Sequence, residues 1–227
     1  MTEPQPCERI AAYFTGIEAD RAARALRSYY APGLHFTGSA FDGLLDHGNP
    51  NGFTAVDMLA VTTLSVEVPP RAALRLIGSP DVEPLLASIP TAADLWTYPE
   101  LLHDDSHASR LWTLVRSHDG IGRTITSKLL AAKRPHLIPI YDQHVRAALG
   151  FDNQWPFMRE VARSPKVARL LVDFGNCRTA AGVPIEWSVL RIIDVVIWMR
   201  QHGWRSHDTS SCDCDFTGFQ LAVGEVA

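Results

Sequence analysis

Apolar residues recur at three-and-four spacing along most of this chain, the pattern of helices that bury one face. Capping residues support two of the helix starts, at Ser106 and at the Thr54–Asp57 capping box. The helix after this box is expected to bury Val56, Leu59, Ala60, Thr63 and Leu64. The other predicted helices cover Glu8–Tyr30, Arg71–Ile77, Val82–Ala87, Thr91–Tyr98, Arg123–Lys133, Tyr141–Leu149, Trp155–Ala162, Pro165–Phe174 and Glu186–Gln201. A strand-like pattern occurs only near residues 34–42, where a small β-hairpin is expected. The pattern predicts an all-α fold in a single domain over residues 1–227, with two helical lobes as one arrangement.

The composition is that of an ordinary globular protein. Of the 227 residues, 46% are hydrophobic and 20% are charged, and four cysteines are too few for a disulfide scaffold. The most apolar stretch, Val189–Met199, is interrupted by Arg191 and Asp194 and is too short to span a bilayer. The N-terminal segment is proline-rich and lacks the features of a signal peptide. We expect a cytoplasmic monomer with no membrane partner.

Charge is unevenly distributed in the sequence. The chain carries a formal net charge of -4, but the 37 residues from Arg110 to Arg146 carry +5 and the remainder carries -9. A basic segment within an acidic chain favours one local anionic partner. The alternative is that these cations form a solvated helix face.

Two glycines separate the predicted helix after Ser106 from the one that starts at Arg123. Gly120 and Gly122 allow a tight turn, and the apolar Ile121 between them can fill the junction of the two helices. The amides of this turn then lie at a helix N-terminus, where they can bind a phosphate of nucleic acid without reading sequence. A helix-turn-helix corner without a ligand is the other interpretation.

The sequence after this turn brings in a family resemblance. Asp142 follows Gly120 by 22 residues, and the segments Gly120-Ile121-Gly122-Arg123-Thr124 and Tyr141-Asp142-Gln143-His144-Val145 flank the apolar connector 135–140. Together they resemble the helix-hairpin-helix DNA glycosylase superfamily, of the endonuclease III type, and the Leu-Ser step at Leu64–Ser65 is similar to the end of an early helix of that family. From about Glu8 to Gln201, the chain is also similar to an uncharacterised actinobacterial domain-of-unknown-function family, which implies no activity.

The superfamily resemblance implies an enzyme without a cofactor that acts on double-stranded DNA carrying a modified base. It would flip that base and hydrolyse its N-glycosidic bond with Asp142 as the catalytic carboxylate, which leaves an abasic site during repair or anti-phage defence. A carboxylate there can stabilise the oxocarbenium character of the sugar and orient a water. Asp142 is alternatively a helix N-cap. The competing functions are a non-catalytic helix-hairpin-helix DNA-binding protein and a hydrolase of free nucleosides or RNA.

The resemblance also assigns residues, and departures from the family modify it. Strand-cleaving members carry a lysine where this chain has Thr124, so a monofunctional glycosylase is expected. The residues expected to contact DNA are Gly120, Ile121, Gly122, Arg123, Thr124 and Lys128. Those expected in the base pocket or as the wedge are Ser65, Glu67, Trp96, Trp112 and His144.

No metal is expected either. Cys7, Cys177, Cys212 and Cys214 do not match the spacing of the family's iron–sulfur cluster. His202, His207, Cys212 and Cys214 could form a zinc tetrad, but a mobile tail over residues 204–227 is the preferred interpretation.

Overall fold

The protein is all-α in a computed structural model that describes residues 3–33, 36–45 and 48–202. Within these residues, the only β pairing is an isolated parallel bridge between Phe53 and Ile77. The α-helices are α1 (Pro6–Ala11), α2 (Ile17–Tyr29), α3 (Ala55–Thr63), α4 (Pro70–Leu76), α5 (Val82–Ala87), α6 (His107–Arg116), α7 (Arg123–Lys133), α8 (Gln143–Leu149), α9 (Gln154–Arg163), α10 (Val167–Ala181) and α11 (Val189–Gln201). Short 3₁₀ turns are η1 (Thr37–Ala40), η2 (Asp42–Leu44) and η3 (Pro99–Leu102).

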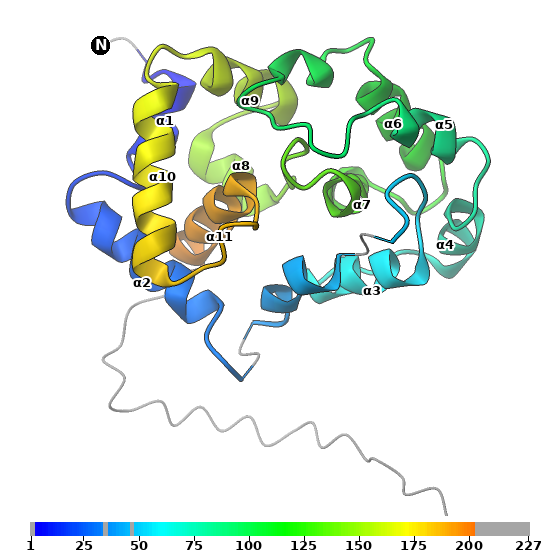
Figure 1. The fold of residues 1–227 in the computed structure, drawn as a ribbon, viewed down its shortest axis with the longest axis horizontal. Coiled ribbons are helices and arrows are strands. Elements are labelled where there is room, and N and C mark those ends of the chain that lie inside the picture. The colour runs from blue at the N-terminus through cyan, green and yellow to red at the C-terminus, as the bar shows by residue number, and fades with distance from the viewer. Residues whose placement is uncertain (1–2, 34–35, 46–47, 203–227) are drawn as a thin grey trace, which may run out of the picture.

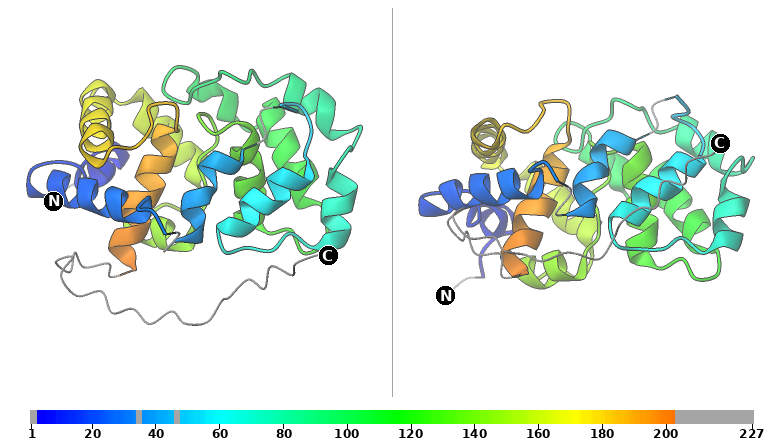
Figure 2. Two further views of the ribbon diagram at one scale, coloured as in Figure 1. Left: turned by 60° about the horizontal axis from the view of Figure 1, so that its bottom comes forward. Right: turned by 90° about the horizontal axis from the view of Figure 1, so that it is seen from below.

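The helices form two groups that share one hydrophobic core. Helices α3 to α7 gather on one side of the molecule, and α1, α2, α10 and α11 gather on the other (Figure 1). Helix α2 packs against both α10 and α11, α11 packs against α8, and α3 packs against α7. The two further views in Figure 2 show α11 inside the molecule, between the outer helices.

Helix α11 is central because it is apolar around almost its whole circumference. Val195, Val196 and Ile197 are completely buried, and the two charged residues near its start, Arg191 and Asp194, are buried as well. No helix within the described ranges has the length and apolar character needed to cross a membrane.

Helix boundaries follow the local caps closely where caps exist. Helix α7 spans the predicted residues, and α6 begins after Ser106, whose hydroxyl accepts a hydrogen bond from the Ser109 amide at 3.1 Å. The Thr54–Asp57 capping box is also present. Of the face predicted for the helix that follows it, Ala60 is completely buried, but Val56 and Leu59 are 42% and 56% exposed.

Three predicted elements are wrong. The helix expected over 8–30 is two helices, because Gly16 has a φ of +60° that breaks the helical path. The segment 91–98 forms turns, fixed where the Leu95 amide donates to the His136 carbonyl at 3.0 Å. The β-hairpin expected near 34–42 is replaced, within its described part, by the 3₁₀ turns η1 and η2.

Candidate functional site

The turn between α6 and α7 is a helical hairpin that requires glycine at one position. Gly120 has a φ of +80°, and a Cβ there would lie 2.8 Å from Cγ of Pro69. Any other residue would therefore be both strained and in collision with the proline ring. Ile121 is 5% exposed and fills the junction between the helices, as the sequence predicts.

The first turn of α7 faces outward. Gly122 is the N-cap and, having no side chain, forms no side-chain capping bond. Within the described part of the chain, the amides of its first turn therefore stay unpaired, and the helix dipole favours an anion there. Gly122 and Arg123 are exposed and Thr124 is half-buried. The Arg123 guanidinium lies 5.7 Å from the ring centroid of Tyr141, which connects the hairpin to the segment that precedes α8.

Asp142 is the N-cap of α8. Its Oδ1 accepts hydrogen bonds from the amides of His144 at 2.7 Å and Val145 at 3.3 Å. One residue earlier, the Tyr141 amide donates to the Ser127 hydroxyl at 2.9 Å and so attaches this segment to α7. The capping interpretation of Asp142 is confirmed, and its carboxylate is half-buried beside the hairpin helix.

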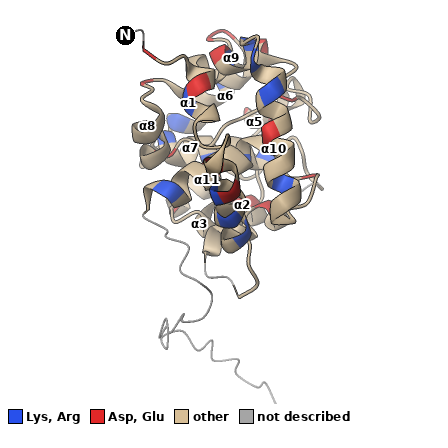
Figure 3. Cartoon of the chain, turned by 90° about the vertical axis from the view of Figure 1, so that its left-hand side faces the viewer, with Lys and Arg blue, Asp and Glu red and all other residues tan. Residues whose placement is uncertain are grey.

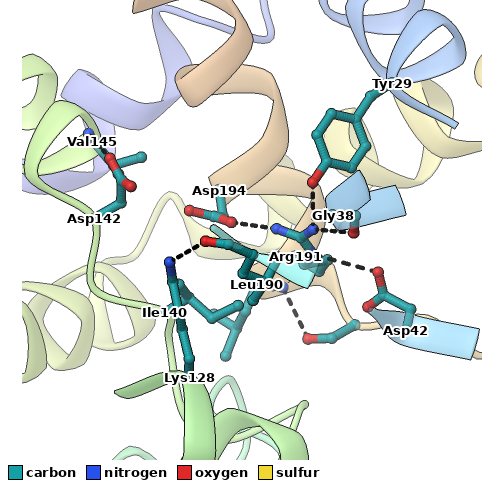
Figure 4. Close-up of polar contacts among 12 residues, drawn as sticks. Tyr29, Gly38, Asp42, Lys128, Ile140, Asp142, Val145, Leu190, Arg191 and Asp194 are labelled. Atoms are coloured by element: carbon teal, nitrogen blue, oxygen red, sulfur yellow. Dashed lines mark hydrogen bonds and ion pairs between the residues drawn. The ribbon is translucent and has the colours of Figure 1, made fainter. Parts of the chain in front are cut away.

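Lys128 does not occupy the exposed position that a phosphate contact requires. It is only 5% exposed, and its ammonium donates to the Leu64 carbonyl at 2.7 Å. Burial lowers the pKa of Lys128, an effect that the nearby carboxylates of Asp194 and Asp142 oppose. In Figure 4, these three side chains approach one another from α11, α7 and the start of α8. Lys128 is an internal cation that joins α7 to the end of α3.

Arg191 lies beyond this group as a buried connecting residue. Its guanidinium donates to Asp194 at 2.5 Å, to the Tyr29 hydroxyl at 2.7 Å, to the Gly38 carbonyl at 2.9 Å and to Asp42 at 3.3 Å. Figure 4 shows these partners around the guanidinium. Burial raises the pKa of Asp194 to about 6, although Arg191 opposes that change. Charges of alternating sign thus extend from Asp142 through Lys128 and Asp194 to Arg191.

The basic segment 110–146 does not form one surface. Lys133 is buried in an ion pair with Asp57 at 2.5 Å. Arg134 is 1% exposed and donates to the carbonyls of Ile89, Pro50 and Leu86, among other partners. The exposed cations of the segment are Arg110, Arg116, Arg123 and Arg146. On the side of the molecule shown in Figure 3, basic and acidic residues are mixed on α1 and α10. Only part of the +5 charge is therefore available to an anionic partner.

Two of the predicted pocket residues lie on the loop that adjoins the hairpin. Ser65 and Glu67 are exposed, and Ser65 has a φ of +59°, a left-handed conformation that is unusual for a residue other than glycine. Lys128 holds the carbonyl immediately before Ser65, and Pro69 at the other end of the loop abuts Gly120. The structure thus brings Ser65 and Glu67 to the hairpin side of the molecule.

The remaining predicted pocket residues are dispersed. Trp96 packs near Phe174, with ring centroids 6.2 Å apart, and does not join the hairpin group. Trp112 lines a separate cavity together with Arg123 and Tyr141. The His144 ring lies 4.2 Å from that of His202, in an edge-to-face contact at the end of α11.

Sequence reasoning missed two features. The first is the Arg191 network, whose only signal was a pair of charges inside an apolar run. The second is the cavity beside Trp112, because four separate segments contribute its walls.

Over the ranges that the structure describes, no group of three or more His, Cys, Asp or Glu side chains could hold a metal ion. Cys7 and Cys177 are buried free thiols. Of the four residues considered for a zinc tetrad, only His202 is described. The other three, His207, Cys212 and Cys214, lie outside the described residues, as does the whole tail 204–227.

The chain matches the DUF6308 family, a family of unknown function, over residues 22–201. This match covers well over half of the 227 residues, and the protein therefore belongs to that family. No curated protein and no solved structure matches the chain significantly.

Proposed function

We propose that this protein is a monofunctional DNA glycosylase, which excises a damaged or modified base by hydrolysis of its N-glycosidic bond. The observation that carries the proposal is the hydrogen bond from the Tyr141 amide to Ser127. Because of it, the segment that presents Asp142 is fixed to the same helix that begins at the Gly120–Arg123 hairpin. A phosphate held by the hairpin and a sugar facing Asp142 would then have a defined separation.

The hairpin supplies the contact to the DNA backbone. The uncapped first turn of α7 offers amides to a phosphate, and the exposed Arg123 adds a positive charge. These contacts position the strand without reading its sequence. Ser65 and Glu67, on the adjoining loop, face solvent where the duplex would pass.

Asp142 supplies the chemistry. Its Oδ1 is engaged by two amides of α8, which orients the carboxylate and leaves Oδ2 to face the sugar. As the N-glycosidic bond breaks, its electron pair leaves with the base, and the carboxylate stabilises the positive charge on the sugar. A water then bonds to C1′ and loses a proton to Asp142, while the departing base takes up a proton from solvent.

Water is the proposed nucleophile because, among the residues that the structure describes, no free amine lies at the hairpin. Thr124 stands where strand-cleaving members of the helix-hairpin-helix glycosylase superfamily carry a lysine, and the ammonium of Lys128 donates to the Leu64 carbonyl. The excised base belongs to the alkylated, deaminated or hypermodified class, which corresponds to repair or to defence against phage DNA.

A base-release assay tests the proposal. Wild type and Asp142→Asn are incubated with end-labelled duplexes that carry damaged, deaminated or glucosylated bases, and the products are analysed with and without alkali. Asparagine also caps helices well, so this variant should fold and bind DNA but release no base. Asp20→Asn, the same chemical change at an exposed position of α2, is the matched control and should keep full activity.

The outcomes separate the candidate functions. Alkali-dependent cleavage by wild type and by Asp20→Asn, but not by Asp142→Asn, supports the glycosylase. Full activity in Asp142→Asn would refute the assignment of Asp142 as the catalytic carboxylate. Cleavage without alkali would identify a lyase amine, with Lys128 the first residue to substitute.

A non-catalytic DNA-binding protein is the second candidate. It is favoured by the two capping bonds of Asp142, which give that residue a structural role without any chemistry. It predicts binding that weakens with salt and on neutralisation of Arg123, with no base release from any duplex.

A further inference from the structure

A cavity of about 220 Å³ lies between α6, the start of α7 and the first turn of α9. Three aromatic side chains, Trp112, Tyr141 and Trp155, contribute to its walls, and Arg116 and Arg123 contribute positive charge. Trp112 and Trp155 meet edge to face, with ring centroids 5.2 Å apart and an angle of 69° between the rings. A planar ring is the kind of ligand that such walls accommodate best.

The two arginines favour an anionic group on that ring. Both are exposed, and within the described part of the chain neither forms an ion pair. Asp152, which also lines the cavity, is paired with Arg146 at 3.1 Å, so part of its negative charge is already compensated. Asp104 is the remaining carboxylate of the lining, and it can accept a hydrogen bond from an amino group.

Two further lining residues carry buried polar atoms that lack a partner among the described residues. These atoms are Nε1 of Trp155, a donor, and Oε1 of Gln154, an acceptor. The Gln154 side chain is held by its Nε2, which donates to the Ile140 carbonyl at 2.7 Å. Both atoms are buried beneath the cavity surface, so a ligand would be held by the accessible lining, through the aromatic walls, the two arginines and Asp104. Nucleobases are planar rings, and several carry an amino group that could donate to Asp104.

The cavity is separate from the carboxylate of the proposed reaction. The backbone at Asp142 is extended, with φ −130° and ψ 138°. Successive side chains of an extended segment point to opposite sides, and Tyr141 lines this cavity whereas Asp142 does not. A nucleotide in the cavity would therefore be a different one from the nucleotide that faces Asp142.

We propose that this cavity is a binding site for one unstacked nucleotide, with the base against Trp112 and Trp155 and the phosphate at Arg116 and Arg123. The nucleotide is either a free mononucleotide or one residue of a single strand that continues past the hairpin. The site does not depend on the chemistry assigned to Asp142, and the two ideas can fail separately.

Binding is measured with the full-length protein by calorimetry and by quenching of tryptophan fluorescence. The probes are the four deoxynucleoside 5′-monophosphates, the corresponding nucleosides, and a short single-stranded oligonucleotide. Arg116→Gln removes a charge that lines the cavity, and Arg110→Gln removes an exposed charge from the same helix outside it. Trp112→Ala removes one wall, and Trp112→Phe keeps an aromatic ring there in case the alanine variant unfolds.

We expect Arg116→Gln to weaken binding by about tenfold or more and Arg110→Gln to change it less than twofold. Trp112→Ala should abolish the quenching of tryptophan fluorescence by the nucleotide, whereas Trp112→Phe should retain nucleotide binding. Asp142→Asn should change neither the quenching nor the binding. Affinity for monophosphates with this pattern identifies a free nucleotide as the ligand, whereas affinity for the oligonucleotide alone identifies a strand. The absence of binding to all probes, or binding that Arg116→Gln and Arg110→Gln weaken equally, would overturn the proposal.

Discussion

Replacement of Arg191 by methionine should destabilise the fold severely. Methionine preserves most of the volume of the side chain but removes the guanidinium from its four partners. The side chain of Arg191 is 5% exposed, and those of Asp42 and Asp194 are 3% and 11% exposed, so water cannot take over the lost contacts.

The size of this loss of stability follows from the two carboxylates, of Asp42 and Asp194, that remain without the guanidinium. Removal of one partner from a buried ion pair costs about 3–5 kcal/mol because the other charge is left uncompensated. Part of that cost is avoided here, since the raised pKa of Asp194 allows this residue to take up a proton near neutral pH. We therefore expect a loss of about 4 kcal/mol in the free energy of unfolding. For a chain of this size, that loss lowers Tm by roughly 8–16 °C.

Urea unfolding followed by circular dichroism measures this loss, with Arg146→Met as the control. Arg146 pairs with the fully exposed Asp152, and such surface pairs contribute only about 0.2–1 kcal/mol. Neutralisation of both carboxylates in Arg191→Met/Asp42→Asn/Asp194→Asn should recover part of the lost stability. A loss below about 1 kcal/mol in Arg191→Met, no larger than in the control, would refute the reasoning.

Three further predictions concern other positions. Burial raises the pKa of Asp194 from 3.8 to about 6 on folding, so its contribution to the free energy of unfolding is greatest at low pH and falls by up to about 3 kcal/mol as pH rises through 6. Asp194→Asn should remove this pH dependence from urea unfolding measured between about pH 5 and 7. Gly120→Ala should cost about 1–3 kcal/mol of stability and weaken the proposed DNA binding, since its Cβ would need the space of Pro69 at a positive φ; thermal melts and a gel-shift assay would detect the two effects. Asp142→Ala should cost about 1 kcal/mol more than Asp142→Asn in thermal denaturation, because alanine cannot cap α8.

Helices with local start and stop signals were predictable from the sequence. Helix α7 follows two glycines and ends before Pro135, and Asp142 and Ser106 cap the helices after them. Over 91–98 the helical pattern was misleading, because a long-range hydrogen bond from Leu95 to His136 fixes turns there instead. Such a bond leaves no trace in a local window of sequence.

The candidate site was predictable in its backbone and not in its charges. The hairpin, the buried Ile121 and the cap at Asp142 all follow from short motifs. Lys128 and Lys133 could not be told from solvated lysines, because their partners come from α3 and from the loop before it. Whether a lysine on a helix is buried depends on which segment packs over it, and that information is distant in the chain.

The buried cations at the C-terminal end of α7, Lys133 and the C-cap Arg134, limit which substitutions this region can accept. By the general preference of protein interiors for apolar residues, Lys133 and Arg134 are unfavourable and hydrophobic replacements would be improvements. Yet Lys133 is the counter-ion of Asp57, and Arg134 donates to the Pro50 carbonyl before α3 and to the Leu86 and Ile89 carbonyls at the end of α5. A substitution such as Lys133→Leu would therefore be harmful unless Asp57 also changed. The C-terminal end of α7 is thus expected to vary only in concert with α3, whereas its exposed N-terminal turn can adapt independently to a ligand.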